Sequence, residues 1–320
     1  MFPLQRLNPV HSLFLKVPAK NLIVIVGPTA VGKTALSVAL ATHLHGQIVS
    51  ADSRQMYREM VIGTAKPSPI EQGGIPHHFI DSHSIHQPLD AAGFGAVARE
   101  VLATLFQQHN TVIVCGGSGL YLQALLEGFD DMPPVPPDVR EAIVAGYHQQ
   151  GLSWLQEQVQ QLDPAHFEKM DQQNPQRLMR ALELLRVAGQ PLDRLRKGRV
   201  SLLPYHIIRL GLEVPRPELY ARINARVDEM IARGLWAEAE SLFVYRNQIP
   251  LQTVGYQEIF DAMQGIYDQG AAIDLIKRNT RKYAKRQLTW FKRDETIRWF
   301  HPDNRATIFR WIDSQLRQND

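Results

Sequence analysis

The sequence contains almost no cysteine and no long apolar stretch. Cys115 is the single cysteine among 320 residues, which excludes an intramolecular disulfide and a zinc site built from several cysteines. No apolar run approaches the roughly 18 residues of a transmembrane helix. Only Leu13 to Leu15 form an apolar cluster near the start, so we expect no signal peptide. We expect residues 1–20 to form a loosely held leader, and the protein to work in a reducing cytoplasm away from membranes.

The overall composition is that of an ordinary globular protein. Hydrophobic residues make up 44% of the chain and charged residues 21%, which excludes a disordered or collagen-like chain. A length of 320 residues suggests about two domains. The formal net charge of +3 is only mildly basic, so the position of the basic residues is more informative than their total.

The first third of the chain alternates between expected strands and helices. Short apolar runs at 22–26, 47–53 and 111–115 are rich in β-branched residues, as is typical of strands buried on both faces of a sheet. One helical pattern follows residues 27–34 and extends to about residue 45, and a second covers 91–109. This alternation predicts right-handed βαβ units and a parallel α/β sheet.

A proline-rich linker interrupts the alternation. Four of the five residues in 133–137 are proline, and the pattern over 138–198 predicts three or four helices without strands. Strand character returns at 206–214. We therefore predict an α/β core of residues 1–130 and 200–320, with a helical insertion domain at 131–199. Further helices are expected at about 217–233, 235–246, 255–265 and 270–292.

Helix caps are expected within the insertion. Asp138 and Glu141 have the spacing of a capping box. Asp163 and Asn174 each precede a proline, which suits the first position of a helix.

A phosphate-binding motif follows the first predicted strand. The glycines allow successive backbone N–H groups to turn inward around an anion, and the helix N-terminus adds positive potential. The lysine supplies a point charge to the outer phosphate oxygens, and the final threonine offers a hydroxyl to Mg²⁺. The motif predicts a site for a di- or triphosphate, ATP included, and does not specify which bond breaks. It consists of Gly27, Pro28, Thr29, Ala30, Val31, Gly32, Lys33 and Thr34.

Polar residues also follow the second and third strands. Asp52 ends the second strand, where it could be a helix N-cap, a Mg²⁺ ligand or a general base. Ser118 lies in the sequence GGSGLY after the third strand, either in a plain tight turn or with its hydroxyl facing a developing charge. Ligands of parallel sheets bind outside the carboxyl ends of the strands, so both residues are expected near the phosphate motif. Cys115 lies within an apolar strand and is interpreted as core.

Two stretches of the chain are strongly basic. Residues 277–293 contain eight Lys or Arg, no Asp or Glu, and several aromatic residues. Residues 177–199 contain seven Lys or Arg against two acidic residues. Basic and aromatic side chains together suit RNA, through phosphate contacts and base stacking, although a solvated helix face is the plain alternative. His77 and His78 are adjacent without further metal-binding residues at suitable spacing, so we interpret them as structural.

Taken in order, these segments resemble the bacterial tRNA dimethylallyltransferases. The resemblance extends over residues 22–295 and implies a P-loop NTPase-like parallel α/β core with an all-helical insertion domain. The matching segments are GPTAVGKT, SADSRQMY (50–57), IGTAKPS (62–68), IPHHFID (75–81), GGSGLY, NPQRLMRALEL (174–184), VGYQEI (254–259) and TRKYAKRQLTWFKRD (280–294).

The resemblance implies a specific reaction. A dimethylallyl group would pass from dimethylallyl diphosphate to N6 of the adenosine directly 3′ of the anticodon, in tRNAs that read codons beginning with U, with release of diphosphate. The P-loop would then hold the diphosphate of the prenyl donor instead of ATP. Mg²⁺ is the implied cofactor, bound at Thr34, and the tRNA anticodon stem-loop is the implied partner. We expect the enzyme to act as a monomer.

The resemblance also implies roles for individual residues. Lys33, Asp52 and Ser118 would be catalytic. Asp52 would act as the base, and Ser118 would supply the hydroxyl near the reacting centre that is usually a threonine in the family. An arginine that grips the diphosphate corresponds to the segment 222–230, where we favour Arg226 and keep Arg222 as the alternative. Contacts with tRNA are expected from Asp52, Ser53, Arg54, Gln55, Ser118, Arg140, Gln176, Arg177, Leu178, Met179, Arg180, Arg278, Arg281, Lys282, Lys285 and Arg286.

Three alternatives remain open on the residues alone. A P-loop small-molecule kinase would explain the phosphate motif but not the insertion or the basic C-terminal helix. A non-catalytic RNA-binding protein would leave the P-loop unused. An enzyme that prenylates free AMP would not need a basic insertion.

Overall fold

The computed structural model describes residues 20–130, 132–195 and 203–318. The chain divides into two compact units, one formed by residues 1–125 and 203–320, the other by residues 126–202. These bounds lie close to the boundaries expected for the core and the insertion. Residues 1–19 of the expected leader and residues 196–198 of the expected helical block lie outside the described residues.

The larger unit is built on a parallel sheet. Its described residues form six strands in the order β3-β2-β4-β1-β5-β6, and every neighbouring pair is parallel. In this register, Ile23 lies between Ile113 and Ile208. The predicted parallel α/β class is therefore confirmed. The strands are β1 (Asn21–Val26), β2 (Gln47–Ser50), β3 (His77–His78), β4 (Thr111–Gly116), β5 (His206–Leu212) and β6 (Arg298–Phe300).

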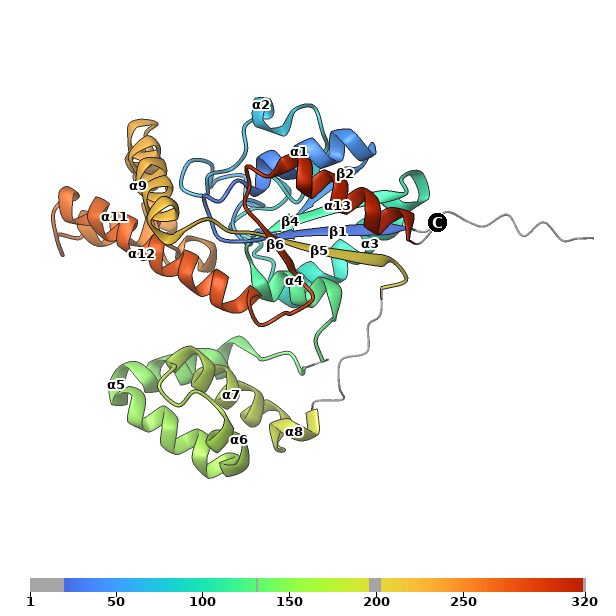
Figure 1. The fold of residues 1–320 in the computed structure, drawn as a ribbon. Coiled ribbons are helices and arrows are strands. Elements are labelled where there is room, and N and C mark those ends of the chain that lie inside the picture. Colours follow the sequence, from blue (N-terminus) through green and yellow to red (C-terminus); the bar gives the residue numbers. More distant parts are fainter. Residues whose placement is uncertain (1–19, 131, 196–202, 319–320) are drawn as a thin grey trace, which may run out of the picture. The chain divides into compact units, whose positions relative to one another are not determined.

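Helices cover both faces of this sheet, as Figure 1 shows. Successive strand residues point to opposite faces, so the continuously apolar central strands need cover on both sides. α1 (Lys33–Leu44) and α13 (Arg305–Arg317) pack on the face that carries Ile23 and Ile25. α3 (Ala91–Gln108) and α4 (Gly119–Leu126) lie on the other face.

A group of helices lies beyond the carboxyl ends of the central strands (Figure 1). They enclose the edge of the sheet at which ligands of parallel sheets bind. The group consists of α9 (Arg216–Ala232), α10 (Leu235–Leu242), α11 (Tyr256–Met263) and α12 (Gln269–Phe291). Two short 3₁₀ turns, Phe243–Tyr245 and Ile249–Leu251, and the one-turn helix α2 (Pro69–Gln72) complete the unit.

The smaller unit is helical throughout its described residues. Its core is formed by apolar side chains such as Ile143, Leu155 and Leu182, which are fully buried. A non-helical residue, Gly151 (φ 77°, ψ −166°), separates two segments of the first helix. The helices are α5 (Pro137–Leu162), α6 (Pro164–Lys169), α7 (Pro175–Ala188) and α8 (Leu192–Leu195).

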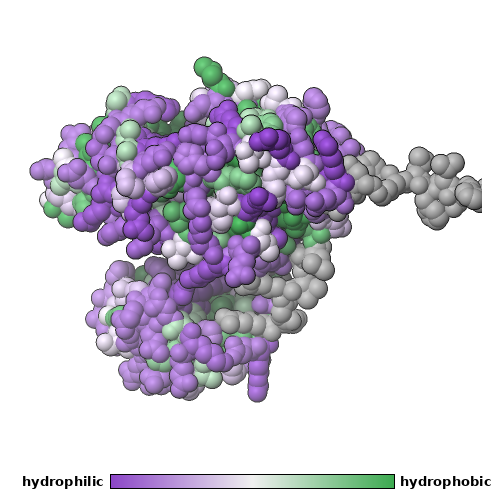
Figure 2. Space-filling view, viewed as in Figure 1, coloured by the Kyte–Doolittle hydropathy of each residue, from purple (hydrophilic) through white to green (hydrophobic). Residues whose placement is uncertain are grey.

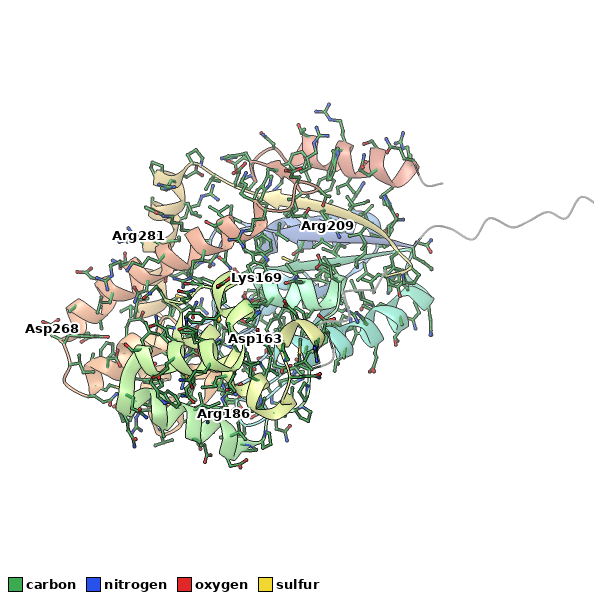
Figure 3. The ribbon with its side chains drawn as sticks, turned by 90° about the horizontal axis from the view of Figure 1, so that it is seen from below. Asp163, Lys169, Arg186, Arg209, Asp268 and Arg281 are labelled. Atoms are coloured by element: carbon green, nitrogen blue, oxygen red, sulfur yellow. The ribbon has the colours of Figure 1, made fainter. Side chains whose placement is uncertain are left out.

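The caps of this unit test the sequence predictions. Asp163, labelled in Figure 3, accepts a hydrogen bond from His166 N at 3.0 Å, and its other carboxylate oxygen accepts one from Leu192 N at 2.9 Å. Asn174 caps α7, so both predicted Asx-Pro caps are confirmed. The predicted capping box at Asp138 is wrong, because α5 begins at Pro137 and places Asp138 inside its first turn.

Hydrophilic residues predominate on the face of the molecule shown in Figure 2. Hydrophobic residues occur there in small separate groups. Within the ranges that the structure describes, no helix is long and apolar enough to cross a membrane.

Candidate active site

The phosphate motif connects β1 to α1 and has the backbone of an anion cradle. Gly27 (φ 147°) and Gly32 (φ 104°) have positive φ, and Ala30 (φ 63°) joins them although it is not glycine. A Cβ on Gly27 would lie 2.6 Å from Leu212 O, so a side chain there would collide with β5. A non-glycine residue held in the left-handed region costs free energy and is common where a loop is shaped for a ligand.

Lys33 is held at the mouth of this cradle. Its Nζ donates to Gly27 O at 3.1 Å and to Pro28 O at 2.8 Å, so the side chain folds back over the loop. Burial lowers the pKa of Lys33, while Cys115 and Asp52 act in the opposite direction. Cys115 was interpreted as core, but it is only half-buried: it packs against the core of the sheet and also lines the pocket beside this cradle. Burial raises the pKa of its thiol.

Asp52 forms the first residue of a tight turn after β2. Its Oδ1 accepts hydrogen bonds from Arg54 N at 2.9 Å and Gln55 N at 3.2 Å. Its Oδ2 has no hydrogen-bond partner among the described residues. Oδ1 therefore fixes the carboxylate in the turn, while Oδ2 can face a ligand. Asp52 can thus cap the turn and also have a chemical role.

Ser118 lies next to this turn and is 9% exposed. Its Oγ accepts from Ser53 N at 3.0 Å and donates to Ser53 Oγ at 3.2 Å. The two turns approach closely because Gly116 has no side chain: a Cβ there would lie 2.3 Å from Ala51 O. The predicted juxtaposition of the two strand ends is thus present, and the Ser118 hydroxyl is anchored to the Asp52 turn.

A pocket of about 450 Å³ joins these elements. Lys33, Thr34, Asp52, Ser53 and Arg54 line it. Its far wall comes from α9, α10, α12 and the segment before α11, and combines apolar side chains with polar ones such as Arg226, Thr280 and Gln287. The apolar residues of this wall include Ile223, Val227, Met230, Leu235, Val254 and Ile276.

The two candidate arginines on α9 occupy different environments. Arg226 lines the pocket. Burial lowers the pKa of its guanidinium, while the negative charges of Glu71 and Glu229 act to raise this pKa. Arg222 instead pairs with Glu218 at 2.6 Å and donates to Val31 O at 3.4 Å. The geometry therefore favours Arg226 for contact with a bound anion.

Helix α12 contributes two pocket residues whose roles the sequence patterns did not indicate. Tyr283 lines the pocket, and its pKa is raised to about 12, by burial first and then by Asp52. Gln287 is 6% exposed and contacts both the P-loop and the turn that holds Ser118. The many basic residues mark the exposed side of this helix. The side that faces the pocket is marked in the sequence only by a Tyr and a Gln four residues apart, a spacing that places them on one helix face.

The basic residues of α12 divide into exposed and paired side chains. Arg278, Lys282, Lys285 and Arg286 are exposed. Arg281, labelled in Figure 3, instead donates to Asn224 Oδ1 at 2.7 Å and lies 5.7 Å from the centre of the Tyr220 ring. Arg281 is therefore partly occupied in joining α12 to α9.

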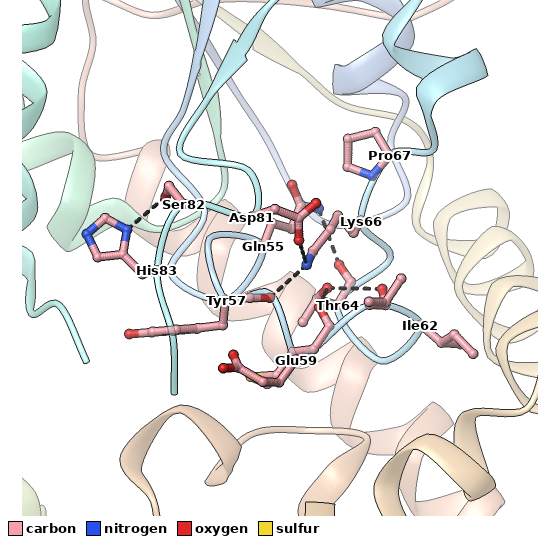
Figure 4. A network of polar contacts seen from close by, with 12 residues as sticks. Gln55, Tyr57, Glu59, Ile62, Thr64, Lys66, Pro67, Asp81, Ser82 and His83 are labelled. Carbon is pink, nitrogen blue, oxygen red and sulfur yellow. Dashed lines mark hydrogen bonds and ion pairs between the residues drawn. The ribbon is translucent and has the colours of Figure 1, made fainter. Parts of the chain in front are cut away.

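A polar network holds the loop between β2 and β3 (Figure 4). Lys66 is 7% exposed, forms an ion pair with Asp81 and donates to a backbone carbonyl. Gln55 Nε2 donates to Thr64 O and Ala65 O, both at 3.2 Å. The side chain of Gln55, expected to contact tRNA, is thus engaged in shaping the pocket wall.

His77 and His78 form the short edge strand β3. His77 Nδ1 hydrogen-bonds with Ile75 O at 2.8 Å, and His78 Nε2 with Gln47 Oε1 at 2.8 Å. Burial lowers the pKa of both rings. In the described part of the chain, no group of three or more His, Cys, Asp or Glu could hold a metal ion. His77 also lines the pocket.

The residues of the smaller unit expected to contact tRNA divide by exposure. Gln176, Arg177 and Arg180 are exposed on α7. Leu178 (0% exposed) and Met179 (8% exposed) are buried in the core of the unit, so their side chains serve packing instead of RNA contact.

Glu183 organises two arginines of this unit. It is 5% exposed and pairs with Arg180 at 3.0 Å and with Arg140 at 3.7 Å. Both guanidinium groups remain more than half exposed, so the carboxylate positions them without covering them.

Comparison with known proteins identifies a family. The model of the IPP transferase family matches residues 55–294. A tRNA dimethylallyltransferase of Cytophaga hutchinsonii is 47% identical, with 93% of this chain and 98% of that protein covered. The structure of the tRNA isopentenylpyrophosphate transferase of Bacillus halodurans matches with a TM-score of 0.70 and 35% identity, covering 94% of this chain and 98% of that one. A eukaryotic dimethylallyltransferase acting on tRNA matches with a TM-score of 0.69 and 25% identity, covering 85% of this chain and 70% of that one. This chain belongs to the IPP transferase family.

Proposed function

We propose that this protein is a tRNA dimethylallyltransferase. It transfers the dimethylallyl group of dimethylallyl diphosphate to N6 of the adenosine directly 3′ of the anticodon, in tRNAs reading codons that begin with U, and releases diphosphate. The observation that supports this best is the composition of one pocket, which combines a P-loop with Lys33, the carboxylate of Asp52 and a group of apolar side chains from α9, α10 and α12. Ser118 anchors the turn that carries Asp52. A kinase needs no apolar wall of this kind beside its phosphate cradle.

Asp52 is the proposed base. The lone pair of adenine N6 is delocalised into the ring, so the amine is a poor nucleophile, and positive charge accumulates on it as the new C–N bond forms. A carboxylate oxygen at hydrogen-bond distance removes the proton and with it that charge. Asp52 suits this role because Oδ1 is fixed by the turn while Oδ2 remains available.

The P-loop is the proposed clamp for the leaving group. Breaking the bond between the prenyl carbon and the diphosphate oxygen builds negative charge on the diphosphate. Lys33, the backbone N–H groups of the loop and Arg226 stabilise that charge where it develops. On binding, Lys33 Nζ would exchange its contacts with Gly27 O and Pro28 O for phosphate oxygens.

Mg²⁺ is proposed as the cofactor of this clamp. It requires oxygen ligands, and in phosphate sites it keeps several waters and uses only one or two protein oxygens. Thr34 lines the pocket and its hydroxyl supplies one such oxygen, so the donor set fits. When bound, the ion would add positive charge near the leaving diphosphate, and Thr34 is the residue proposed to hold it.

The apolar wall is the proposed site of the dimethylallyl tail. Water would trap an allylic carbon with developing positive charge, so this part of the pocket must stay dry. Val227, Met230 and Leu235 line it from α9 and α10, and Ile276 lines it from α12.

The acceptor is proposed to be tRNA, bound by a monomer in the cytoplasm. A base that reaches an enclosed pocket must first leave its stack, which requires contacts to the surrounding RNA. Exposed Lys282, Lys285 and Arg286 on α12 suit such contacts, as do the exposed arginines of the helical unit.

The test is a transfer assay with radiolabelled dimethylallyl diphosphate. Unmodified tRNA, AMP and no acceptor are run in parallel, each with wild-type protein and with Asp52→Asn. Asparagine keeps an oxygen for Arg54 N and Gln55 N but cannot accept the proton. We expect label in tRNA alone, and a fall in rate of about 100-fold or more for Asp52→Asn with tRNA affinity nearly unchanged.

Other results of this assay favour other functions. Label transferred to AMP but not to tRNA would indicate an AMP prenyltransferase. In a parallel reaction that contains ATP, stoichiometric ATP hydrolysis coupled to turnover would indicate a kinase or ATPase. An equal loss of tRNA affinity and rate in Asp52→Asn would make Asp52 a binding residue.

A further inference from the structure

Gln287 joins two loops of the active site that belong to different strands. Its Oε1 accepts a hydrogen bond from Thr29 N in the P-loop, at 2.9 Å. Its Nε2 donates to Gly117 O in the turn after β4, at 2.9 Å. Both ends of one buried amide are thereby satisfied, one by each loop.

The second loop packs closely enough against the Gln287 amide that a side chain at residue 117 would displace it. A Cβ on residue 117 would lie 2.2 Å from Gln287 Nε2. Gly117 therefore makes room for the amide, and the turn is shaped around a side chain that comes from α12. Ser118 is the next residue, and its hydroxyl is anchored to Ser53 beside Asp52.

These contacts form one continuous path across the pocket. It runs from the P-loop through Gln287 to the turn of Ser118, and from there to the turn of Asp52. The first of these elements holds the proposed leaving group, and the last two hold the proposed base and hydroxyl. The amide of Gln287 thus lies where it sets the separation between the two halves of the reaction.

The chemistry of this bridge requires a side chain with a donor and an acceptor. A carboxylate could accept from Thr29 N but could only repel Gly117 O, and an apolar side chain would leave both groups unpaired. We propose, on the basis of the proposed function, that Gln287 is a positioning residue that fixes the diphosphate cradle relative to Asp52 and Ser118. It acts on the rate of transfer through geometry, since a displacement of about 1 Å can slow a reaction about 100-fold.

Two substitutions and one control test this inference in the full-length protein. Gln287→Met removes both hydrogen bonds, and Gln287→Glu removes only the donor. Gln264→Met makes the same change at an exposed glutamine of the same unit. The measurements are the single-turnover transfer rate at saturating dimethylallyl diphosphate and tRNA, the Kd of inorganic diphosphate by calorimetry, and thermal unfolding.

We expect both Gln287 variants to transfer about 100-fold more slowly, with the Kd of diphosphate changed by less than about threefold. Gln264→Met should behave as wild type. Protonation gives the side chain of Gln287→Glu a donor and an acceptor again. Its rate relative to wild type should therefore rise as the pH falls from about 8 to about 5.5, while the ratio for Gln287→Met stays flat.

Several results would overturn the inference. A wild-type rate in Gln287→Met would do so, as would diphosphate affinity that falls in parallel with the rate, because Gln287 would then be a binding residue. A flat pH ratio for Gln287→Glu also contradicts it, and this isosteric variant decides the matter if Gln287→Met does not fold. Failure of the wild-type protein to transfer to tRNA would instead refute the proposed function.

Discussion

At the scale of single residues, the two arginines of α9 offer a matched comparison. They lie one helical turn apart, but only Arg226 lines the pocket, while Arg222 is paired with Glu218. Local pairing, which sequence spacing does not reveal, distinguishes them.

We expect Arg226→Gln to raise the KM for dimethylallyl diphosphate by about 10- to 100-fold, the value of one charge-assisted hydrogen bond to phosphate. Arg222→Gln should change it by less than about threefold, because exposed ion pairs contribute little. Steady-state kinetics of both variants with saturating tRNA would decide. Equal effects would mean that both guanidinium groups reach the diphosphate.

Tyr283 gives a prediction for alkaline pH. Burial and Asp52 raise its pKa to about 12 in the folded protein, above the roughly 10 of an unfolded chain. The folded state therefore holds the phenolic proton more tightly. The resulting stabilisation is complete below pH of about 10 and is lost as the pH rises toward about 12, where both states become ionised.

We therefore expect the free energy of unfolding of wild type to fall more steeply than that of Tyr283→Phe between these two pH values. Urea unfolding at several alkaline pH values measures the difference. If the two proteins lose stability in parallel, Tyr283 titrates alike in the folded and unfolded chain.

At the scale of elements, one carboxylate fastens the loop before α2 to α10. Glu238 accepts hydrogen bonds from Val61 N at 3.2 Å, Ile62 N at 2.8 Å and Gly63 N at 3.0 Å. It also accepts one from Tyr256 OH at 2.6 Å. The residues that follow, Gly63 to Ala65, line the pocket, so this contact shapes part of the wall.

Glu238→Gln should destabilise the protein by about 2 kcal/mol, because an amide N–H would then face a backbone N–H that has lost its acceptor. The KM for dimethylallyl diphosphate should also rise as the wall loosens. Glu240→Gln, an exposed residue of the same helix, is the control. Thermal unfolding and kinetics of the two variants would show whether the effect belongs to position 238.

The basic face of α12 gives a second prediction at this scale. Neutralising Lys282, Lys285 and Arg286 together should weaken tRNA binding and flatten its dependence on salt. Each phosphate contact releases counterions from the RNA, so a protein with fewer contacts releases fewer counterions on binding. Removing three charges from α13, at Arg305, Arg310 and Arg317, controls for the change in net charge. An unaltered salt slope in the α12 variant would make that face merely solvated.

The elements predicted from sequence were those with a long or strongly periodic pattern. The central strands β1, β4 and β5 are buried on both faces and were recognisable as continuous apolar runs. The edge strands β3 and β6 contain only two and three residues, too few for any periodicity, and were missed. α4 and α13 were also not predicted.

The candidate site was predictable where a motif marks it and not where distant residues meet. Lys33, Asp52 and Ser118 follow strands in recognisable turns. Gln287 reaches the P-loop across 258 residues of sequence, and no local pattern indicates such a contact. Leu178 and Met179 were expected to contact tRNA because the whole segment 174–184 resembles the family, whereas helical periodicity directs their side chains into the core.

At the scale of the whole molecule, the chain consists of two units that each have a hydrophobic core. The larger unit buries both faces of its sheet, and the smaller one buries a cluster around Leu155, Leu178 and Leu182. A unit with its own core can in principle fold alone. The residues proposed for chemistry belong to the larger unit, while Arg140, Arg177 and Arg180 belong to the smaller one.

Replacing residues 126–202 by a short Gly/Ser bridge should therefore leave a folded core that still binds diphosphate with an affinity close to that of the full chain. Transfer to tRNA should collapse, because the arginines proposed to hold the anticodon arm are gone and nothing presents the extruded base. Circular dichroism and calorimetry with inorganic diphosphate verify the fold and the cradle, and the transfer assay is run on the same preparation. Near-normal transfer to tRNA by the shortened protein would show that the larger unit alone holds the anticodon arm. Loss of diphosphate binding in a folded core would show that the smaller unit supports the P-loop site as well.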